Sequence, residues 1–205
     1  GAWRDCRIGR IYEGTNEINR MLSVGMLIKK AMKGHIDFIN PATKVADELM
    51  GIPSFEVPDL TELFAQEKLI LTNLKKIFLM LAGAGIKKFG DKLEEHQQML
   101  LAVSDILIEI YMTESALLRT EKNCNRLGKE TQTNQIAMTQ LYLYKAVDII
   151  QSKGKEVIVS FSSGDEQKGL LMGLKRFTKY YEYPNVIELK NIIAEKLKEE
   201  NKYCF

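Results

Sequence analysis

One short stretch near the N-terminus combines residue types that could do chemistry. The run YEGT at positions 12–15 places a glutamate between an aromatic residue and a glycine, directly before a threonine that can open a helix. A glycine lets a ligand or an unusual backbone conformation come close, and the free N–H groups of a helix N-terminus attract anions. A glutamate in a turn before a helix is nevertheless usually solvated. These facts alone therefore favour a surface carboxylate over a catalytic one.

The other candidate residues offer no competing chemistry. The three cysteines, Cys6, Cys124 and Cys204, lie far apart and form no CxxC pair, and His35 and His96 have no partner at metal or triad spacing. This pattern predicts neither a metal site, nor a disulfide framework, nor a catalytic thiol. Reduced thiols indicate a reducing compartment, either a bacterial-type cytoplasm or a space like the mitochondrial matrix.

The overall composition is that of an ordinary soluble protein. Of 205 residues, 45% are hydrophobic, and 29 basic against 27 acidic residues leave a net charge of +2. Such a balance gives no support for nucleic-acid binding. No apolar run reaches the roughly 18 residues of a membrane-spanning helix. The chain opens with Gly1 shortly before the YEGT run, and we expect it to be a piece of a longer protein.

Helical periodicity of apolar residues dominates the chain and predicts its fold. The expected helices span 16–32, 42–50, 61–89, 91–127, 133–152, about 163 to the break at Pro184, and 185–201. The β-branched run EVIVSF (156–161) could form a strand, but a lone strand would have nothing to pair with, so we interpret it as a continuation of helix. The pattern predicts an all-α fold, an antiparallel helical bundle.

The proline distribution suggests how the chain is divided. Three of the four prolines fall within residues 35–59, which we interpret as a linker with one short helix. We therefore expect one unit at 1–34 and a helical domain at 60–205. In the first unit, Thr15 is a good N-cap for helix 16–32, and the charge of Glu17 suits its first turn. The predicted apolar face of this helix comprises Ile18, Met21, Leu22, Gly25 and Met26, up to Lys29.

The residues around YEGT also resemble a known family. The run WRDCRIGRIYEGTNEINR at 3–20 is similar to the C-terminal signature of the acyl-CoA dehydrogenases, with charged, aromatic and glycine residues in register. The resemblance implies that Glu13 is the catalytic base, which takes the α-proton of a fatty acyl-CoA thioester. It implies that Tyr12 and Gly14 contact the substrate. A carboxylate can remove so weak an acid's proton only where the developing enolate is stabilised and water is excluded.

The same resemblance implies a flavin cofactor. Thr15, Asn16 and Glu17 match positions that contact FAD in the family, although Glu17 stands where many members have glutamine. The flavin would take the β-hydrogen as a hydride, leaving a trans-2-enoyl-CoA as in fatty acid β-oxidation, and would pass its electrons to an electron-transfer flavoprotein. The family's cofactor site also needs domains that precede this segment. We therefore expect the chain alone to be inactive.

The remaining residues resemble the helical C-terminal extension of the very-long-chain subgroup, by length, helical character and position. That resemblance implies packing on the rest of the subunit in a homo-oligomer, and peripheral membrane contact. The stretch LLMGLKRFTKYY (170–181) mixes apolar, basic and aromatic residues as interfacial helices do, but such a stripe can equally pack on neighbouring helices. The alternative function is a non-catalytic helical module for protein interaction or membrane docking.

Overall fold

A computed structural model describes residues 1–51 and 57–204, and every regular element in that part of the chain is a helix. The predicted all-α fold is confirmed. The α-helices are α1 (Ala2–Ile8), α2 (Asn16–Met32), α3 (Ile39–Met50), α4 (Ala65–Phe89), α5 (Gln97–Leu127), α6 (Thr133–Phe161), α7 (Gly164–Phe177) and α8 (Val186–Glu200). Two short 3-10 helices, η1 (Gly90–Glu95) and η2 (Lys129–Gln132), precede α5 and α6.

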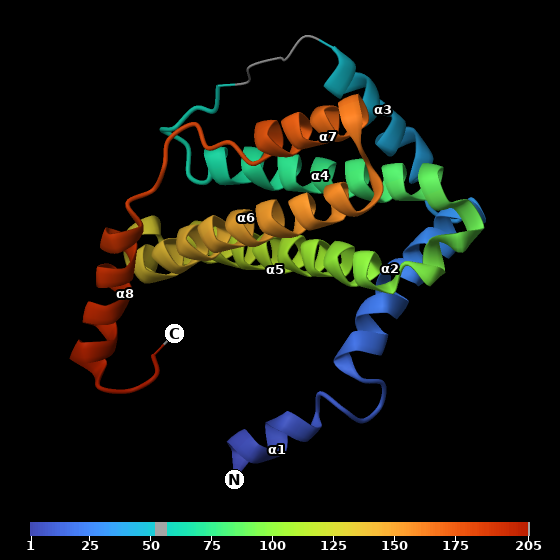
Figure 1. Cartoon of the computed structure of the whole chain (residues 1–205). Coiled ribbons are helices and arrows are strands. Elements are labelled where there is room, and N and C mark those ends of the chain that lie inside the picture. The colour runs from blue at the N-terminus through green and yellow to red at the C-terminus, as the bar shows by residue number, and fades with distance from the viewer. Residues whose placement is uncertain (52–56, 205) are drawn as a thin grey trace.

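The bundle is built around two long antiparallel helices, α5 and α6, with α4 packed on both of them (Figure 1). α7 lies against α4 and α6, and α3 packs on α4. α2 lies on the first part of α5, α8 contacts α6, and α1 extends away from the bundle (Figure 1). This arrangement places the YEGT stretch at the free end of α2, outside the bundle.

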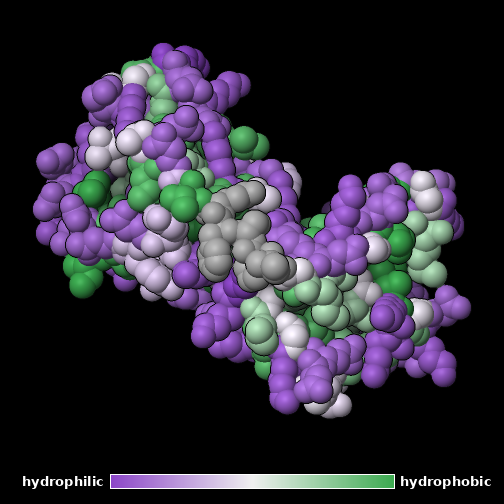
Figure 2. Space-filling view, turned by 90° about the horizontal axis from the view of Figure 1, so that it is seen from above, coloured by the Kyte–Doolittle hydropathy of each residue, from purple (hydrophilic) through white to green (hydrophobic). Residues whose placement is uncertain are grey.

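Apolar side chains from the central helices form the core. Its fully buried members include Leu74, Ile77, Leu81, Ile106, Leu143, Ile150 and Ile158. Burying each such side chain contributes roughly 1.5–3 kcal/mol. The segment Ala65–Glu95 is long and apolar enough to span a membrane by length and composition. Half of the 18-residue apolar window within it is nevertheless buried inside the bundle. Other apolar residues remain on the surface, where Figure 2 shows hydrophobic patches among hydrophilic ones.

Most predicted helices are present, and their ends differ where side chains intervene. The EVIVSF run continues α6 without a break to Phe161, as predicted, and the helix predicted at 185–201 runs from Val186 with Asn185 as its cap. α4 begins at Ala65, four residues later than predicted. The Asp59 carboxylate accepts hydrogen bonds from the backbone N–H and hydroxyl of Thr61, and Phe64 has a φ of +63°. Both features hold residues 59–64 in turns.

Three further boundaries were predicted wrongly. α5 begins at Gln97 because the residues before it form η1, and His96 separates the two. α7 ends at Phe177, well before Pro184, because the Thr178 hydroxyl and N–H turn back to the carbonyl of Leu174. α3 begins three residues early, at Ile39, with its proline in the first turn, where a missing N–H costs nothing. The short helix α1 was not predicted.

The basic and aromatic stretch at 170–181 points largely inward. Leu174, Phe177 and Tyr180 are buried, whereas Met172 and Tyr181 are exposed. Phe89, at the end of α4, packs edge to face against Phe161. The packing interpretation of this stretch is therefore supported.

α2 packs through a different face from the predicted one. Its buried residues are Val24, Ile28 and Ala31, whereas Ile18 and Leu22 of the predicted face are exposed. Met26 of that face is exposed as well, and Met21 and Gly25 are intermediate. The periodicity was correctly recognised as helical, but α2 is apolar on more than one side. Only contact with α5 decides which side is buried here.

Glycines allow α7 to approach its neighbours closely. A Cβ at Gly154 of α6 would lie 2.7 Å from Cδ1 and 3.1 Å from Cδ2 of Leu174. A Cβ at Gly173 would lie 2.7 Å from Cδ2 of Leu49 and 2.9 Å from Sδ of Met80. Leu174 is itself fully buried, so it has little room to move away.

This contact gives a test with a matched control. We expect Gly154→Ala to destabilise the protein by about 1 kcal/mol, because an overpacking cost of about 1–3 kcal/mol outweighs a gain of about 1 kcal/mol in helix propensity. Gly169→Ala, on α7, would meet nothing within 4 Å. It should stabilise by up to about 1 kcal/mol. Urea unfolding followed by circular dichroism measures both, and equal stabilisation by the two changes would contradict the proposed packing.

A polar contact anchors α2 on α5. The Arg20 guanidinium donates to the Asp105 carboxylate in a half-buried ion pair, and Lys153 Nζ of α6 lies 4.0 Å from the same carboxylate. One turn further along, the Ser23 and Ser104 hydroxyls lie 3.2 Å apart. The anchor therefore ties the N-terminal part of α2 to the centre of the bundle.

Removing the charge of this anchor should loosen α2. We expect Asp105→Asn to cost about 1–3 kcal/mol, because it leaves the half-buried guanidinium of Arg20 without its counter-charge. Amide hydrogen exchange over α2 should speed up. The control is Glu94→Gln, which breaks the exposed Lys29–Glu94 pair and should change stability by less than about 1 kcal/mol. If exchange in α2 is equally unchanged in both variants, the anchor does not hold the helix.

Candidate active-site loop

The residues that join α1 to α2 form a loop closed by its own hydrogen bonds. The Asn16 N–H donates to the Arg10 carbonyl at 3.1 Å, across the base of the loop. The Asn19 side-chain amide donates to the Gly14 carbonyl at 2.8 Å. Both ends of the segment that carries Glu13 are therefore fixed to the start of α2.

The backbone of this loop is unusual at two consecutive residues. Glu13 has a φ of +58° and Gly14 a φ of +90°. A positive φ is uncommon for a residue with a side chain, and such residues cluster at functional sites. A side chain at position 14 would be excluded by space as well, because a Cβ there would lie 2.6 Å from Oδ1 of Asn19. The turn thus requires glycine after the glutamate and holds that glutamate in a defined conformation.

The loop leads into a capped helix N-terminus. The Thr15 hydroxyl oxygen accepts from the Ile18 N–H at 3.3 Å, as its predicted role as N-cap requires. Asn16 and Glu17 follow as the first two residues of α2. In the described part of the chain the N–H of Glu17 has no acceptor, so it stays available at the positive end of the helix.

The six predicted site residues lie together on one open surface. Tyr12, Glu13, Gly14 and Glu17 are exposed, and Thr15 and Asn16 are partly buried. Among the described residues the Glu13 carboxylate has no hydrogen-bond or ion-pair partner. The cavities found in the described chain are lined by residues other than these six. The loop therefore supplies a carboxylate and a helix N-terminus, but no wall that would enclose a reacting group and exclude water.

The sequence did not predict the cavity of about 580 Å³ between α3, α4 and α7, although the stretch 170–181 singled out above supplies part of the lining. The lining residues come from three segments that are far apart in the chain. The mixture of apolar, basic and aromatic residues in that stretch, together with Lys76 on α4, is the signal that the sequence offers. The convergence of these residues becomes visible only in the folded bundle.

Comparison with known proteins identifies the family. The sequence model described as "Acyl-CoA dehydrogenase, C-terminal domain" matches residues 73–176. A probable acyl-CoA dehydrogenase of Bacillus subtilis (strain 168) is 36% identical over 202 residues, which cover 98% of this chain and 34% of that protein. The crystal structure of an acyl-CoA dehydrogenase complexed with FAD from Bacillus anthracis superposes with a TM-score of 0.90 at 36% identity, covering 99% of this chain and 34% of that one.

The chain spans about a third of the length of each of these relatives. The family-model match lies wholly in α4 to α7 and thus outside the run at 3–20 that first suggested the resemblance. Two separate parts of the sequence therefore lead to one assignment. The chain belongs to the acyl-CoA dehydrogenase family.

Proposed function

We propose that this chain is the C-terminal segment of an FAD-dependent acyl-CoA dehydrogenase and supplies the catalytic base, Glu13. The observation that carries the proposal is the positive φ of Glu13 and Gly14 in a loop closed on both sides. Such a conformation costs about 1–3 kcal/mol for a residue with a side chain, and proteins retain it where it positions a functional group. Family membership and similarity along the whole chain support the same role.

In this proposal Glu13 removes the α-proton of a fatty acyl-CoA thioester. Its carboxylate is unpaired in the described chain and free to face a substrate. Gly14, which has no side chain, lets the thioester approach the backbone, and Tyr12 lines the acyl chain. Bound FAD supplies the acceptor for the β-hydride, and an electron-transfer flavoprotein would then accept the electrons.

The N-terminus of α2 fits a contact with FAD. The free N–H of Glu17 and the positive end of the helix suit an oxygen acceptor, and Thr15 and Asn16 lie beside it. The Glu17 carboxylate accepts hydrogen bonds and repels phosphate. We therefore assign Glu17 to a hydroxyl or amino group of the cofactor, where a glutamine would serve equally.

The exposed apolar residues of α2 indicate where the rest of the enzyme would lie. Ile18 and Leu22 are each more than half exposed, and Ile11 and Tyr12 extend this apolar surface into the loop. A helix that is apolar on several sides is usually buried within a larger protein. We propose that the remaining two thirds of the enzyme cover this surface and enclose the loop, in a homo-oligomeric assembly.

The base assignment is tested in the full-length enzyme that contains this segment. We expect Glu13→Gln to slow flavin reduction by acyl-CoA by about 100-fold to 10,000-fold, because the amide cannot accept the α-proton. Anaerobic stopped-flow spectroscopy of the flavin, with acyl-CoAs of graded length, measures the rate.

The matched control is Glu94→Gln, which removes an exposed carboxylate on η1 far along the chain from the loop. It should leave the rate of flavin reduction unchanged. Normal flavin reduction in the Glu13→Gln enzyme, with FAD still bound, would overturn the assignment of the base.

The isolated 205-residue chain should neither bind FAD nor oxidise acyl-CoA, because nothing in the described chain encloses the Glu13 loop. It should also self-associate through the uncovered face of α2, since exposed apolar patches favour association. Titration with FAD followed by visible absorbance tests the first expectation, and light scattering tests the second. A purified chain that retains visible flavin absorbance would contradict the first, and a strict monomer the second.

A further inference from the structure

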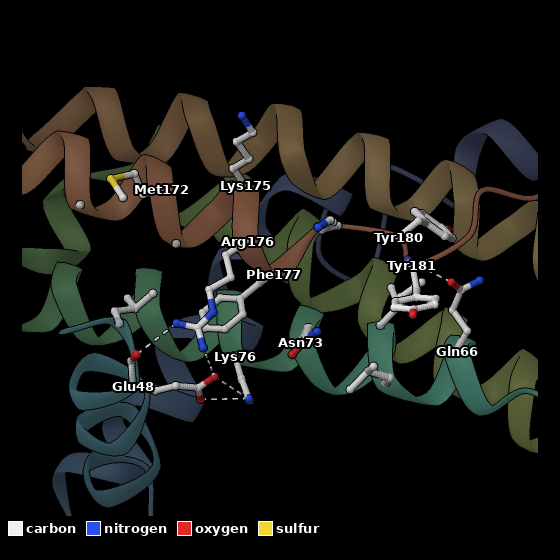
Figure 3. Close-up of a pocket in the computed structure, with 16 residues that line it drawn as sticks. Glu48, Gln66, Asn73, Lys76, Met172, Lys175, Arg176, Phe177, Tyr180 and Tyr181 are labelled. Atoms are coloured by element: carbon white, nitrogen blue, oxygen red, sulfur yellow. Dashed lines mark hydrogen bonds and ion pairs between the residues drawn. The ribbon is translucent and has the colours of Figure 1, made fainter. Parts of the chain in front are cut away.

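The cavity between α3, α4 and α7 has the size and lining of a ligand site. Its volume is about 580 Å³, within the range of about 300–1,000 Å³ that is typical of small-molecule pockets. α4 forms one wall, α7 and the residues after it form the other, and the C-terminal end of α3 closes one end (Figure 3).

Most of the lining is apolar. The apolar lining residues are Leu49, Leu69, Ile70, Met172, Phe177 and Tyr181. Gly169 of α7 also lines the cavity, and a Cβ there would meet nothing within 4 Å. The cavity can therefore take an alkyl chain against its apolar side chains.

The charged residues of the lining are mainly basic. The lining holds four cations, Lys76, Lys175, Arg176 and Lys179, and one carboxylate, Glu48, an excess of three positive charges. Lys175 and Lys179 have no ion-pair partner in the described part of the chain. Burial raises the pKa of the nearby Tyr180 hydroxyl, which therefore stays neutral and adds no negative charge.

The guanidinium fork of Arg176, its two terminal nitrogens, is already bonded to Glu48. Lys76 Nζ lies 2.9 Å from a Glu48 carboxylate oxygen, and Arg176 reaches the other oxygen at 3.3 Å and the Glu48 carbonyl at 3.1 Å. Figure 3 shows both cations converging on Glu48, while Lys175 points away from them. The Asn73 side chain of α4 also lines the cavity (Figure 3). Its amide has no hydrogen-bond partner among the described residues.

We propose that this cavity binds a single-chain amphiphile with a monoanionic head, namely a long-chain carboxylate. The alkyl chain lies along the apolar lining of α4 and α7, and the carboxylate meets the Asn73 amide and Lys179, since Lys76 is already held by Glu48. A phosphorylated head group would favour a bidentate arginine fork, and here Glu48 already holds that fork. The site is separate from the Glu13 loop and does not depend on the proposed catalytic function.

The test uses the whole 205-residue chain and dodecanoate, below its micelle concentration, in isothermal titration calorimetry. We expect one saturable site. Gly169→Phe should weaken binding by at least about tenfold, since an aromatic ring placed in the cavity displaces the alkyl chain and a loss of about 1.4 kcal/mol equals that factor. Gly169→Ala adds one methyl group and serves as the size control, with less than about a threefold change.

Two further comparisons test the head group. Lys179→Gln should weaken dodecanoate binding about twofold to fivefold, as expected for a partly exposed charge pair. Lys168→Gln changes a lysine of α7 that pairs with Asp165 and does not line the cavity, so it should have no effect. Dodecan-1-ol, which carries no charge, should bind more weakly than dodecanoate to the unmodified chain.

Three results would overturn the proposal. The first is absence of dodecanoate binding to the unmodified chain. The second is unchanged binding in Gly169→Phe, which would place the ligand elsewhere, for example on the exposed face of α2. The third is equal binding of dodecanol, which would remove the role of the charge. Circular dichroism of each variant confirms that the fold is kept, and none of these results bears on the role of Glu13.

Discussion

The contact between Leu174 and Gly154 determines how one side of this bundle is built. Leu174 fills the space that a side chain at position 154 would take, and this draws α7 onto α6. The preceding residue, Gly173, leaves room for Leu49 of α3 and Met80 of α4. Two consecutive residues of α7 thus fix the helix against α6 on one side and against α3 and α4 on the other. The cavity beside α7 exists only because this spacing is set.

The ion pairs around Glu48 orient what this packing has brought together. Phe177, which is fully buried, lies close to both cations, with Lys76 Nζ and Arg176 Cζ at 5.5 and 5.6 Å from its ring centroid. Partly exposed ion pairs contribute little free energy by themselves. Their effect is to fix the end of α3, since Arg176 bonds both the side chain and the carbonyl of Glu48. Apolar contacts therefore set the position of α7, and the ion pairs set the orientation of the end of α3.

The sequence predicted what depends on local signals. The Thr15 cap of α2 and the unbroken helix through Phe161 follow from residues close together in the chain. The sequence also identified Glu13 as a candidate, but it could not predict the positive φ of a residue that has a side chain. It could not predict the buried face of α2, because contact with α5 selects that face, or the meeting of Gly154 with Leu174, because helix rotation decides it. The division into units at 34 and 60 stays a prediction.

α2 connects the helical bundle to the loop that carries Glu13, the proposed base. A helix is stiff, so a residue fixed on it also fixes its ends. Arg20, which pairs with Asp105, lies little more than one helical turn after Thr15. Because each helical residue adds a rise of roughly 1.5 Å, the pair lies close to the loop. The bundle therefore holds the Glu13 loop at a set distance through one ion pair and the buried Val24 and Ile28. The opposite side of α2 stays uncovered, so the same helix can join the bundle to the rest of the enzyme without moving the loop.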